Sequence, residues 1–480
     1  MAEEKKASQE ATDLQKKLCY KEKNIWDKYS TDEERQAITD FNRDYIHFLN
    51  AAKTEREVIH ESVKMLEAKG FQNLESMEKA KAGDKVYLNL RNKGLLAAVV
   101  GKKAPEEGFN LVGSHIDSPR LDLKPNAVWE QSDMVFLKTH YYGGVKKYHY
   151  ASTQLAIHGV VVKKDGTSVN IVFGEDPSEP CLTIADLLIH LSQEQMQKKA
   201  SEVITGENLK LLVGGKPYPD ENINERFKLQ FLQILNEKYG IVERDLLTAE
   251  IEVVPAHKAR FVGFDSAFVG GYGQDDRVCA YTSLMALLDT PTDVEKTYAI
   301  LFFDKEEVGS NGNTGAKSDV YALALDILAE KMLGRDQTAA ERRGLIMNTT
   351  LLSSDVTAAF DPNYPEVADP MNFCKASYGL GICKYSGGGG KGSTSDASAE
   401  LFTKVTRLLD DHDVAWQQGE LGRIDLGGGG TIAMFFANRG YEVIDCGVAL
   451  LAMHSCFEIS SAVDVYETYK AYKVFMEKMA

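Results

Sequence analysis

The stretch from Tyr298 to Ser310, YAILFFDKEEVGS, constrains the fold more than any other part of this sequence. It begins with an apolar run that ends at Phe303 and continues with acidic residues, among them Glu306 and Glu307, before a Gly-Ser turn. Such an apolar run is typical of a buried strand in a parallel sheet. Because neighbouring side chains of a strand point in opposite directions, we expect one glutamate to bind a metal and the other to face a substrate.

Strand-like and helix-like segments alternate along most of the chain. The expected strands or apolar segments are Lys85–Leu90, Leu95–Val100, Phe109–Gly113, Phe264–Gly271, Gly344–Asn348, Tyr378–Tyr385, Asp413–Gln417 and Glu442–Cys446. The expected helices follow capping boxes at Ser30–Glu33 and Thr54–Glu57 or cover Val278–Leu288, Ser395–Leu409, a run from Thr431 and Ala462–Lys478. This alternation predicts an α/β fold with a mostly parallel sheet flanked by helices. Residues 1–30 are highly charged and predict a solvated or loosely helical arm.

The pattern changes between residues 127 and 256. A hairpin is expected around Asp165-Gly166, followed by helices at Ile184–Lys199 and Asn222–Lys238. No cluster of metal-binding residue types follows these strands. We therefore predict an inserted α+β domain at 127–256 and a discontinuous catalytic domain formed by 1–126 and 257–480, since 480 residues exceed one ordinary core.

Five of the predicted segments of the larger domain lead into residues that bind metals. These residues are His115, Asp275, the pair Glu306 and Glu307, Asp355 and His454. Ligands of open α/β sheets bind at the carboxyl ends of the strands, so residues far apart in sequence would converge there. Histidine nitrogen with carboxylate oxygen suits Zn²⁺, with Mn²⁺ or Co²⁺ as substitutes.

The number of ligands indicates what the site does. One catalytic zinc needs three protein ligands, so this larger set fits two metals bridged by a carboxylate. Asp117 lies two residues after His115 and would accept the other ring N–H of that histidine. The glutamate of the 306–307 pair that does not bind metal would transfer a proton. The pattern therefore predicts metal-assisted hydrolysis.

Two glycine-rich segments suggest further sites. Gly387–Gly390 precedes Lys391-Gly392 and does not match the phosphate-binding pattern, so tight turns are favoured there. Gly427–Gly430 with Thr431 either offers backbone N–H groups to an anion or simply links a strand to a helix. No GxSxG nucleophile motif is present.

Charge and cysteine content exclude several classes of partner. Lys plus Arg number 55 and Asp plus Glu 71, and the resulting net charge of −16 disfavours nucleic acid and anionic membranes. The seven cysteines form no CxxC motif and indicate a reducing compartment. The N-terminus lacks an apolar signal region, and no membrane-spanning stretch is expected, so the predicted location is the cytoplasm.

Five ordered motifs resemble the M18 family of metallo-aminopeptidases, the aspartyl aminopeptidase group. They read GSHIDSPRLDLKP, GGYGQDDR, FFDKEEVGS, LLSSDVTAAFDPNY and LAMHS, and they extend over nearly the whole chain. The resemblance implies a zinc-exopeptidase-like fold that hydrolyses peptides. It also implies that the inserted segment, with YYGGV and LTIADLLIHL, is a dimerisation domain within homo-oligomers, up to dodecamers built from dimers.

The resemblance also assigns roles to individual residues. It implies that His115, Asp275 and Asp355 hold one zinc and that Asp275, Glu307 and His454 hold the other, with Asp275 as the bridge. Glu306 would be the general base, and Asp117 would orient His115. His190 would complete the active site of a neighbouring subunit.

The preferred N-terminal residue of the substrate stays open. Eukaryotic aspartyl members differ where this chain reads YSGGGGKGSTSD and have Asp-Asn where it has Asp275-Asp276, so the chain is more similar to the bacterial branch. An N-terminal Asp or Glu is one expected substrate class. Lys384 and Lys391 would either meet an acidic side chain or be solvated, and Gly430 and Thr431 would help to bind substrate.

These observations together predict a cytoplasmic dinuclear zinc aminopeptidase. Two alternatives remain at this point: a deacylase or carboxypeptidase on a related dinuclear scaffold, and a self-assembling scaffold or cargo protein with vestigial activity.

Overall fold

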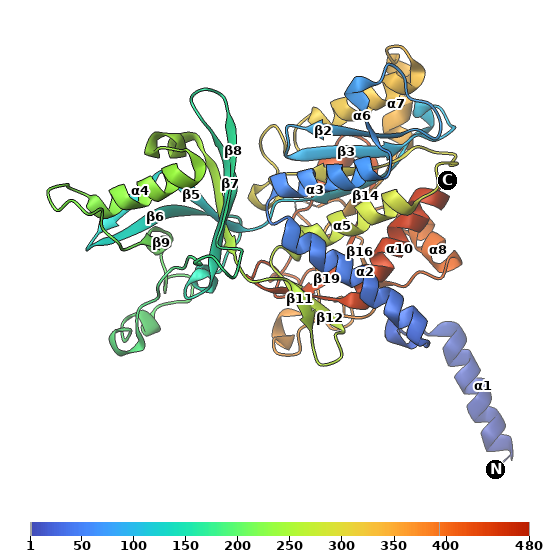
Figure 1. Cartoon of the computed structure of the whole chain (residues 1–480). Helices are drawn as coiled ribbons and strands as arrows, with labels where there is room; N and C mark the ends of the chain where they lie inside the picture. Colours follow the sequence, from blue (N-terminus) through green and yellow to red (C-terminus); the bar gives the residue numbers. More distant parts are fainter. Residues whose placement is uncertain (1, 393, 480) are drawn as a thin grey trace.

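A nine-stranded mixed sheet forms the centre of the computed structural model, which describes residues 2–392 and 394–479 (Figure 1). In spatial order its strands are β1 (Gln72–Asn73), β2 (Lys85–Leu90), β3 (Gly94–Val99), β13 (Tyr298–Phe303), β4 (Asn110–His115), β14 (Thr350–Ser354), β18 (Glu442–Gly447), β16 (Leu380–Cys383) and β17 (Trp416–Gln418). The neighbours β13, β4, β14 and β18 are parallel to one another, whereas β3 and β16 pair with them antiparallel. The predicted α/β class is confirmed, and these four strands form the longest parallel run of the sheet, with further parallel pairs at its two ends.

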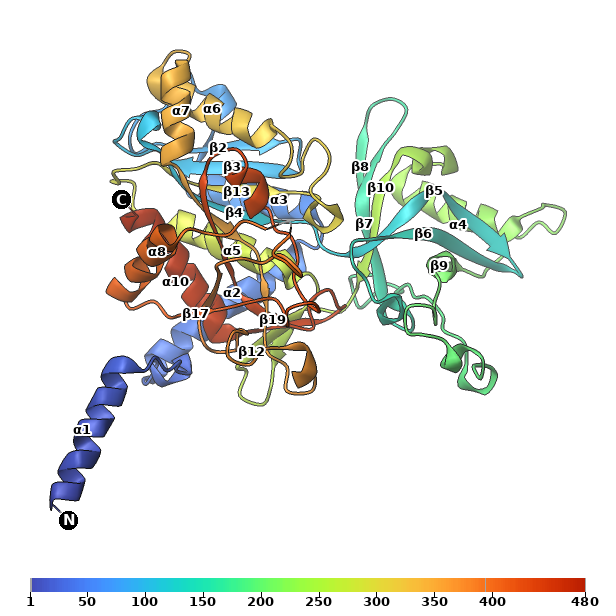
Figure 2. The same cartoon turned by 180° about the vertical axis from the view of Figure 1, so that it is seen from behind.

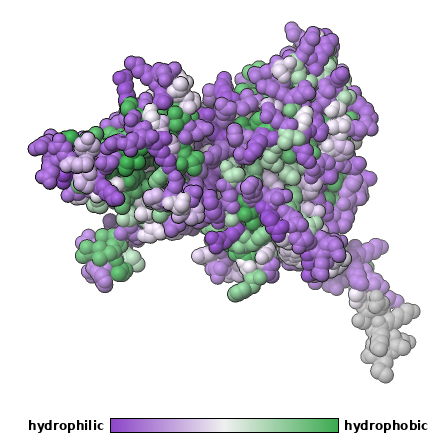
Figure 3. All heavy atoms as spheres, viewed as in Figure 1, coloured by the Kyte–Doolittle hydropathy of each residue, from purple (hydrophilic) through white to green (hydrophobic). Residues whose placement is uncertain are grey.

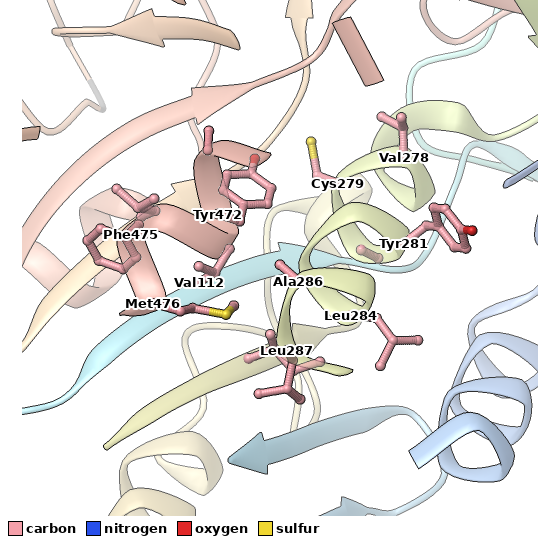
Figure 4. Packing of buried hydrophobic residues seen from close by; sticks show 14 of the residues in the cluster. Val112, Val278, Cys279, Tyr281, Leu284, Ala286, Leu287, Tyr472, Phe475 and Met476 are labelled. Atoms are coloured by element: carbon pink, nitrogen blue, oxygen red, sulfur yellow. The ribbon is translucent and has the colours of Figure 1, made fainter. Parts of the chain in front are cut away.

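Helices cover both faces of this sheet. They are α2 (Asp32–Ala51), α3 (Glu55–Ala68), α5 (Gln274–Asp289), α8 (Ala399–Asp411) and α10 (Ala462–Lys478) on one face, and α6 (Val320–Leu333), α7 (Ala339–Asn348) and α9 (Ala433–Ala437) on the other. Alternate residues of each strand pack against opposite layers, as the pleat requires. Val112 of β4 belongs to the buried cluster that includes residues of α5 and α10 (Figure 4), while its neighbour Leu111 belongs to the cluster on the other face, with Phe436 of α9.

The six-stranded antiparallel sheet lies to one side of the central sheet in both views (Figures 1 and 2). Its order is β8 (Ser168–Phe173), β7 (Leu155–Val162), β10 (Glu250–Pro255), β5 (Arg120–Gln131), β6 (Met134–Tyr142) and β9 (Lys210–Gly214), and α4 (Arg226–Tyr239) packs against it. The predicted hairpin at Asp165-Gly166 is the β7–β8 connection. Because β5 begins at Arg120, this sheet takes residues from before the predicted boundary at 126; the division into two domains stays a prediction.

The five-stranded sheet lies beside the carboxyl ends of the central strands. Its order is β11 (Arg260–Val262), β12 (Phe268–Gly271), β20 (Glu458–Ser461), β19 (Ala449–Leu451) and β15 (Thr357–Ala358). It was not distinguished in the sequence, because its strands are two to four residues long and follow other predicted elements directly. Two of the predicted metal-binding residues, Asp275 and His454, lie just after strands of this sheet.

Three local predictions need correction. No α-helix forms at 184–199, where the chain has only the short 3₁₀ turns Ile189–Leu191 and Gln195–Gln197. Gly344–Asn348 is the end of α7, which begins with an overlooked capping box formed by Thr338 and Glu341. The first capping box is formed by Thr31 and Glu34, one residue later than predicted, whereas the Thr54–Glu57 box is confirmed.

The N-terminal arm forms helix α1 (Ala2–Leu18), which projects away from the rest of the chain (Figure 1). Within the described residues, we find no helix with the length and apolar character needed to cross a membrane.

Candidate active site

Three neighbouring parallel strands deliver three parts of the predicted metal-binding set. His115 is the last residue of β4, and Asp355 directly follows β14. Glu306 and Glu307 follow β13, which lies next to β4. Adjacent parallel strands end at the same edge of a sheet, so these side chains meet there.

The other two residues come from the five-stranded sheet. Asp275 lies just after β12, at the start of α5, and His454 follows β19 with a positive φ of 64°. The expectation that all five segments belong to one sheet is therefore wrong. The site lies between the edges of two sheets, although the same residues still converge.

Asp275 lies between the two histidines. Its Oδ1 is 3.0 Å from Nε2 of His115, and its Oδ2 is 3.0 Å from Nε2 of His454. The Asp275 side chain is almost completely buried. One carboxylate that presents a different oxygen to each of two imidazoles has the arrangement required of a ligand shared by two metals.

The remaining carboxylates are distributed between the two histidines. Asp355 Oδ1 is 3.6 Å from Nε2 of His115, and Glu307 Oε2 is 3.5 Å from Nε2 of His454. Ligand atoms of His115, Glu306 and Asp355 lie within 4.8 Å of one another, and so do those of His115, Asp275 and Glu307. The structure thus brings together all six side chains predicted from the sequence.

Asp117 organises the segment around Glu306 and Glu307. Its Oδ1 accepts a hydrogen bond from the backbone N–H of Glu306 at 3.1 Å, and its Oδ2 accepts one from that of Glu307 at 3.2 Å. Nδ1 of His115 is 3.4 Å from Oδ1 of Asp117 but 3.0 Å from its backbone carbonyl. The nearer acceptor for the His115 ring is therefore the carbonyl, and the carboxylate mainly holds the two glutamate amides.

A tight turn, not strand alternation, separates the two glutamates. Strand β13 ends at Phe303, Lys305 has a left-handed φ of 68°, and Glu306–Val308 form a 3₁₀ turn. The predicted strand geometry at this point is wrong, because Asp117 draws both amides toward one carboxylate. Glu306 still shares a cluster with Asp355, and Glu307 contacts His454.

Burial and crowding of the carboxylates dominate the electrostatics of the site. Burial, with the nearby charge of Asp355, raises the pKa of Glu306 to about 8. Burial and the charge of Asp275 raise the pKa of Glu307, and burial also raises that of Asp355. Although burial acts in the opposite direction, hydrogen bonds with His115 and His454 lower the pKa of Asp275.

These features fit divalent cations. One buried and three half-buried carboxylate residues, with two imidazoles, concentrate negative charge, which cations would neutralise. Oε1 of Glu307 is buried, and in the part of the chain that the structure describes no hydrogen-bond donor reaches it. An unpaired buried carboxylate oxygen is costly unless a ligand binds it.

Two functional contacts were missed in the sequence. Glu458 is buried, and it accepts hydrogen bonds from the backbone N–H groups of Asp275 at 3.1 Å and His454 at 2.7 Å. Gly144 provides the carbonyl that lies 3.0 Å from Nδ1 of His454. The only available signal was position, since Glu458 is four residues beyond His454 and Gly144 belongs to the YYGGV motif.

The predicted substrate-binding residues are not part of this cluster. His190 is exposed in the turn Ile189–Leu191. Thr431 donates a hydrogen bond to Asp445 at 2.7 Å, and after Gly430 the short helix α9 begins only at Ala433.

The two lysines considered for acidic substrates share one partner. Lys384 is 2.7 Å and Lys391 is 3.0 Å from Asp396, so their charges are partly neutralised. Lys391 also lies over the ring of Tyr385, beside a cavity of about 140 Å³ whose lining includes Arg423.

An α/β fold with a cluster of two histidines and four carboxylates between the edges of two sheets is the arrangement of a metal-dependent hydrolase. Comparison with known proteins is consistent with this class. Residues 48–476 match the family model described as aminopeptidase I zinc metalloprotease (M18). The chain belongs to the M18 family of zinc aminopeptidases.

Relatives match along nearly their whole length. A probable M18 family aminopeptidase 1 from Clostridium acetobutylicum is 47% identical, with 95% of this chain and 98% of the relative covered. The crystal structure of an M18 family aminopeptidase from Thermotoga maritima has a TM-score of 0.91 and 47% identity, and the match covers 96% of this chain and 100% of that one. A dodecameric mApe1 from S. cerevisiae, at 21% identity, 90% and 95% coverage and a TM-score of 0.72, shares the fold.

Proposed function

We propose that this protein is a dinuclear zinc aminopeptidase that uses Asp275 as the bridging ligand. The observation that carries the proposal is the position of the Asp275 carboxylate, 3.0 Å from Nε2 of both His115 and His454. His115 and Asp355 would complete one site, and His454 and Glu307 the other. The unpaired Oε1 of Glu307 supports its place in this set.

The steps of the proposed reaction would be shared between the bound metal ions and Glu306. Two bound zinc ions would activate a water and stabilise the oxygens of the tetrahedral intermediate, with Mn²⁺ or Co²⁺ as possible substitutes. Glu306 would accept the proton of that water and donate it to the leaving amine. A carboxylate whose pKa is raised by burial is suited to both steps, because it can hold the proton between them.

The substrate would be a peptide with a free N-terminus. Because Asp396 lies within 3.0 Å of both Lys384 and Lys391, we expect no strong dependence on an N-terminal Asp or Glu. Gly430, Thr431 and the neighbouring cavity remain candidates for contact with the substrate. The alternatives of deacylase, carboxypeptidase and scaffold protein are disfavoured by the family.

We also propose assembly into dimers, and into a dodecamer like that of the yeast relative, through residues 127–256 with the start of β5, called the inserted region below. Large apolar side chains gather there on an exposed loop, visible as a green group at the lower left in Figure 3, and they are Leu187, Leu188, Ile189, Leu191 and Met196. Exposed apolar patches of this kind mark interfaces. If a neighbouring subunit covers this loop, His190 of this chain would approach the active site of that neighbour.

All seven cysteines are free, which supports the predicted cytoplasmic location.

One set of measurements tests the activity. Metal analysis of protein reconstituted with Zn²⁺ should give two ions per subunit, and a screen of aminoacyl-amide substrates should give turnover that chelators abolish. Acetylation of the N-terminus of a peptide substrate should prevent its hydrolysis. One zinc per subunit with full activity would refute the dinuclear proposal, and equal hydrolysis of the acetylated peptide would refute the aminopeptidase.

The assembly proposal has its own test. Ile189→Glu should reduce the mass measured by light scattering, whereas Leu323→Glu, at an exposed apolar residue of α6, should not. An unchanged mass for the Ile189 variant would contradict this interface.

A further inference from the structure

The end of strand β6 contacts the metal-binding cluster at three successive residues. Strand β6 belongs to the six-stranded sheet of the inserted region and ends at Tyr142. Tyr142, Gly143 and Gly144 then pass the cluster before the chain returns to the inserted region. We call these three residues the contact segment.

Tyr142 bonds to the residue that holds both glutamates. Its hydroxyl donates a hydrogen bond to Oδ2 of Asp117 at 2.8 Å. The same oxygen accepts the backbone N–H of Glu307. Removal of the Tyr142 hydroxyl would therefore leave Asp117 freer to rotate, and with it the turn that carries Glu306 and Glu307.

The two glycines contact the second half of the cluster. A Cβ atom at Gly143 would lie 3.2 Å from Cβ of Glu307 and 3.3 Å from its Oε2. A Cβ atom at Gly144 would lie 3.2 Å from Nδ1 of His454, the nitrogen whose hydrogen bond to the Gly144 carbonyl turns Nε2 toward Asp275 and Glu307. Such second contacts fix the orientation of a ligating histidine.

The ring of Tyr142 packs against a buried arginine where the inserted region meets helix α3. The guanidinium of Arg120 lies 3.9 Å from the ring centroid. Arg120 is buried and pairs with Asp122 at 2.9 Å, with Glu252 of β10 at 3.1 Å and with Glu55, the first residue of α3, at 3.7 Å. The position of the Tyr142 hydroxyl thus depends on how β6 and β10 sit against α3.

We infer that the contact segment positions the metal ligands, so that the docking of the inserted region sets the metal affinity of the active site. Tyr142 is a positioning residue that acts through Asp117, and Gly144 acts through His454. This inference rests on the proposed dinuclear function.

The test compares two neighbouring tyrosines of the full-length protein. Tyr142→Phe removes the hydroxyl and keeps the ring over Arg120, while Tyr141→Phe makes the same change at a residue that is 44% exposed. Three properties are measured: zinc affinity by competition with a chelator, the visible absorption of the Co²⁺-substituted protein, and kcat/KM. We expect Tyr142→Phe to lower zinc affinity and kcat/KM by about 10- to 100-fold and to change the Co²⁺ spectrum, with Tyr141→Phe like the parent.

A second variant separates positioning from general damage. Gly144→Ala introduces no positive-φ strain, because Gly144, unlike Gly143 with a φ of 73°, lies outside the left-handed region. It should weaken only one of the two zinc-binding steps, the one that involves His454, with little change in melting temperature.

Parent-like zinc affinity and Co²⁺ spectra for both Tyr142→Phe and Gly144→Ala would overturn the inference, as would an equal loss in Tyr141→Phe. A parent protein that binds no zinc would overturn the proposed function as well. That failure is distinguishable, because it appears before any substitution is made.

Discussion

Replacement of Glu306 by glutamine tests the division of labour at the centre of the site. The glutamine side chain would keep the shape of the glutamate but could not accept a proton as a carboxylate does. Because burial disfavours the charged carboxylate and raises the pKa of Glu306 to about 8, a neutral glutamine of the same shape should cost the fold little. We therefore expect the free energy of unfolding of Glu306→Gln to change by less than about 1 kcal/mol.

The expected kinetic effect is much larger than this change in stability. Loss of a positioned general base lowers turnover by about 10²- to 10⁴-fold. At about 1.4 kcal/mol for each factor of ten, the barrier rises by about 3 to 5 kcal/mol. Glu306 lies within the cluster formed with His115 and Asp355, so we expect the change to act on proton transfer in this cluster and not on distant substrate binding.

The assay measures kcat and zinc content in the same samples. Glu306→Gln should retain two zinc ions per subunit and lose most turnover. Glu307→Gln is the matched control, since Glu307 is 3.5 Å from His454 and should bind metal; it should lose one zinc. Normal kcat in a zinc-replete Glu306→Gln protein would refute the base assignment, and loss of zinc from Glu306→Gln alone would exchange the two roles.

Two further predictions concern residues outside the ligand set. Glu458→Gln places an NH₂ group against the backbone N–H of Asp275 or His454. It should therefore lower the free energy of unfolding by about 1 to 3 kcal/mol, measured by denaturant titration, and weaken zinc binding, measured by zinc titration. An unchanged zinc affinity would contradict the role of Glu458. Although burial opposes it, hydrogen bonds of His158 with Glu175 at 3.0 Å and Glu57 at 2.7 Å raise the pKa of His158. The contribution of His158 to stability should thus be complete below about pH 6.5 and be lost as the pH rises through the folded-state pKa. The free energies of unfolding of His158→Asn and the parent, measured with denaturant, should differ most at pH 6 and least at pH 9. A difference that does not change with pH would refute this prediction.

Long apolar runs made the centre of the fold predictable. Strand β2 coincides with the predicted Lys85–Leu90, and α10 coincides with Ala462–Lys478. Both elements are defined by local signals, a run of strand formers for one and a long amphipathic pattern for the other. His115 was predictable for the same reason, because it ends a buried strand. Asp355 was identified as a ligand although its strand, β14, had been expected at Gly344–Asn348, where α7 ends.

Features that depend on contacts distant in sequence were not predictable. The apolar spacing at 184–199 suggested a helix, but Leu187, Leu188, Ile189 and Leu191 are exposed in the single chain and do not pack a helix against the other described residues. The turn at Glu306 and Glu307 depends on Asp117, almost 190 residues earlier. Gly144 and Glu458 act through a backbone carbonyl and backbone amides, which leave no distinctive pattern in the sequence.

The order in which the ligands occur in the chain has a consequence for biosynthesis. His115 is made well before His454, and α10, which covers the central sheet, follows His454. A nascent chain therefore lacks one histidine of the cluster until His454 has been made. We therefore expect a product of translation that is truncated before His454 to lack the complete cluster and, with it, peptidase activity.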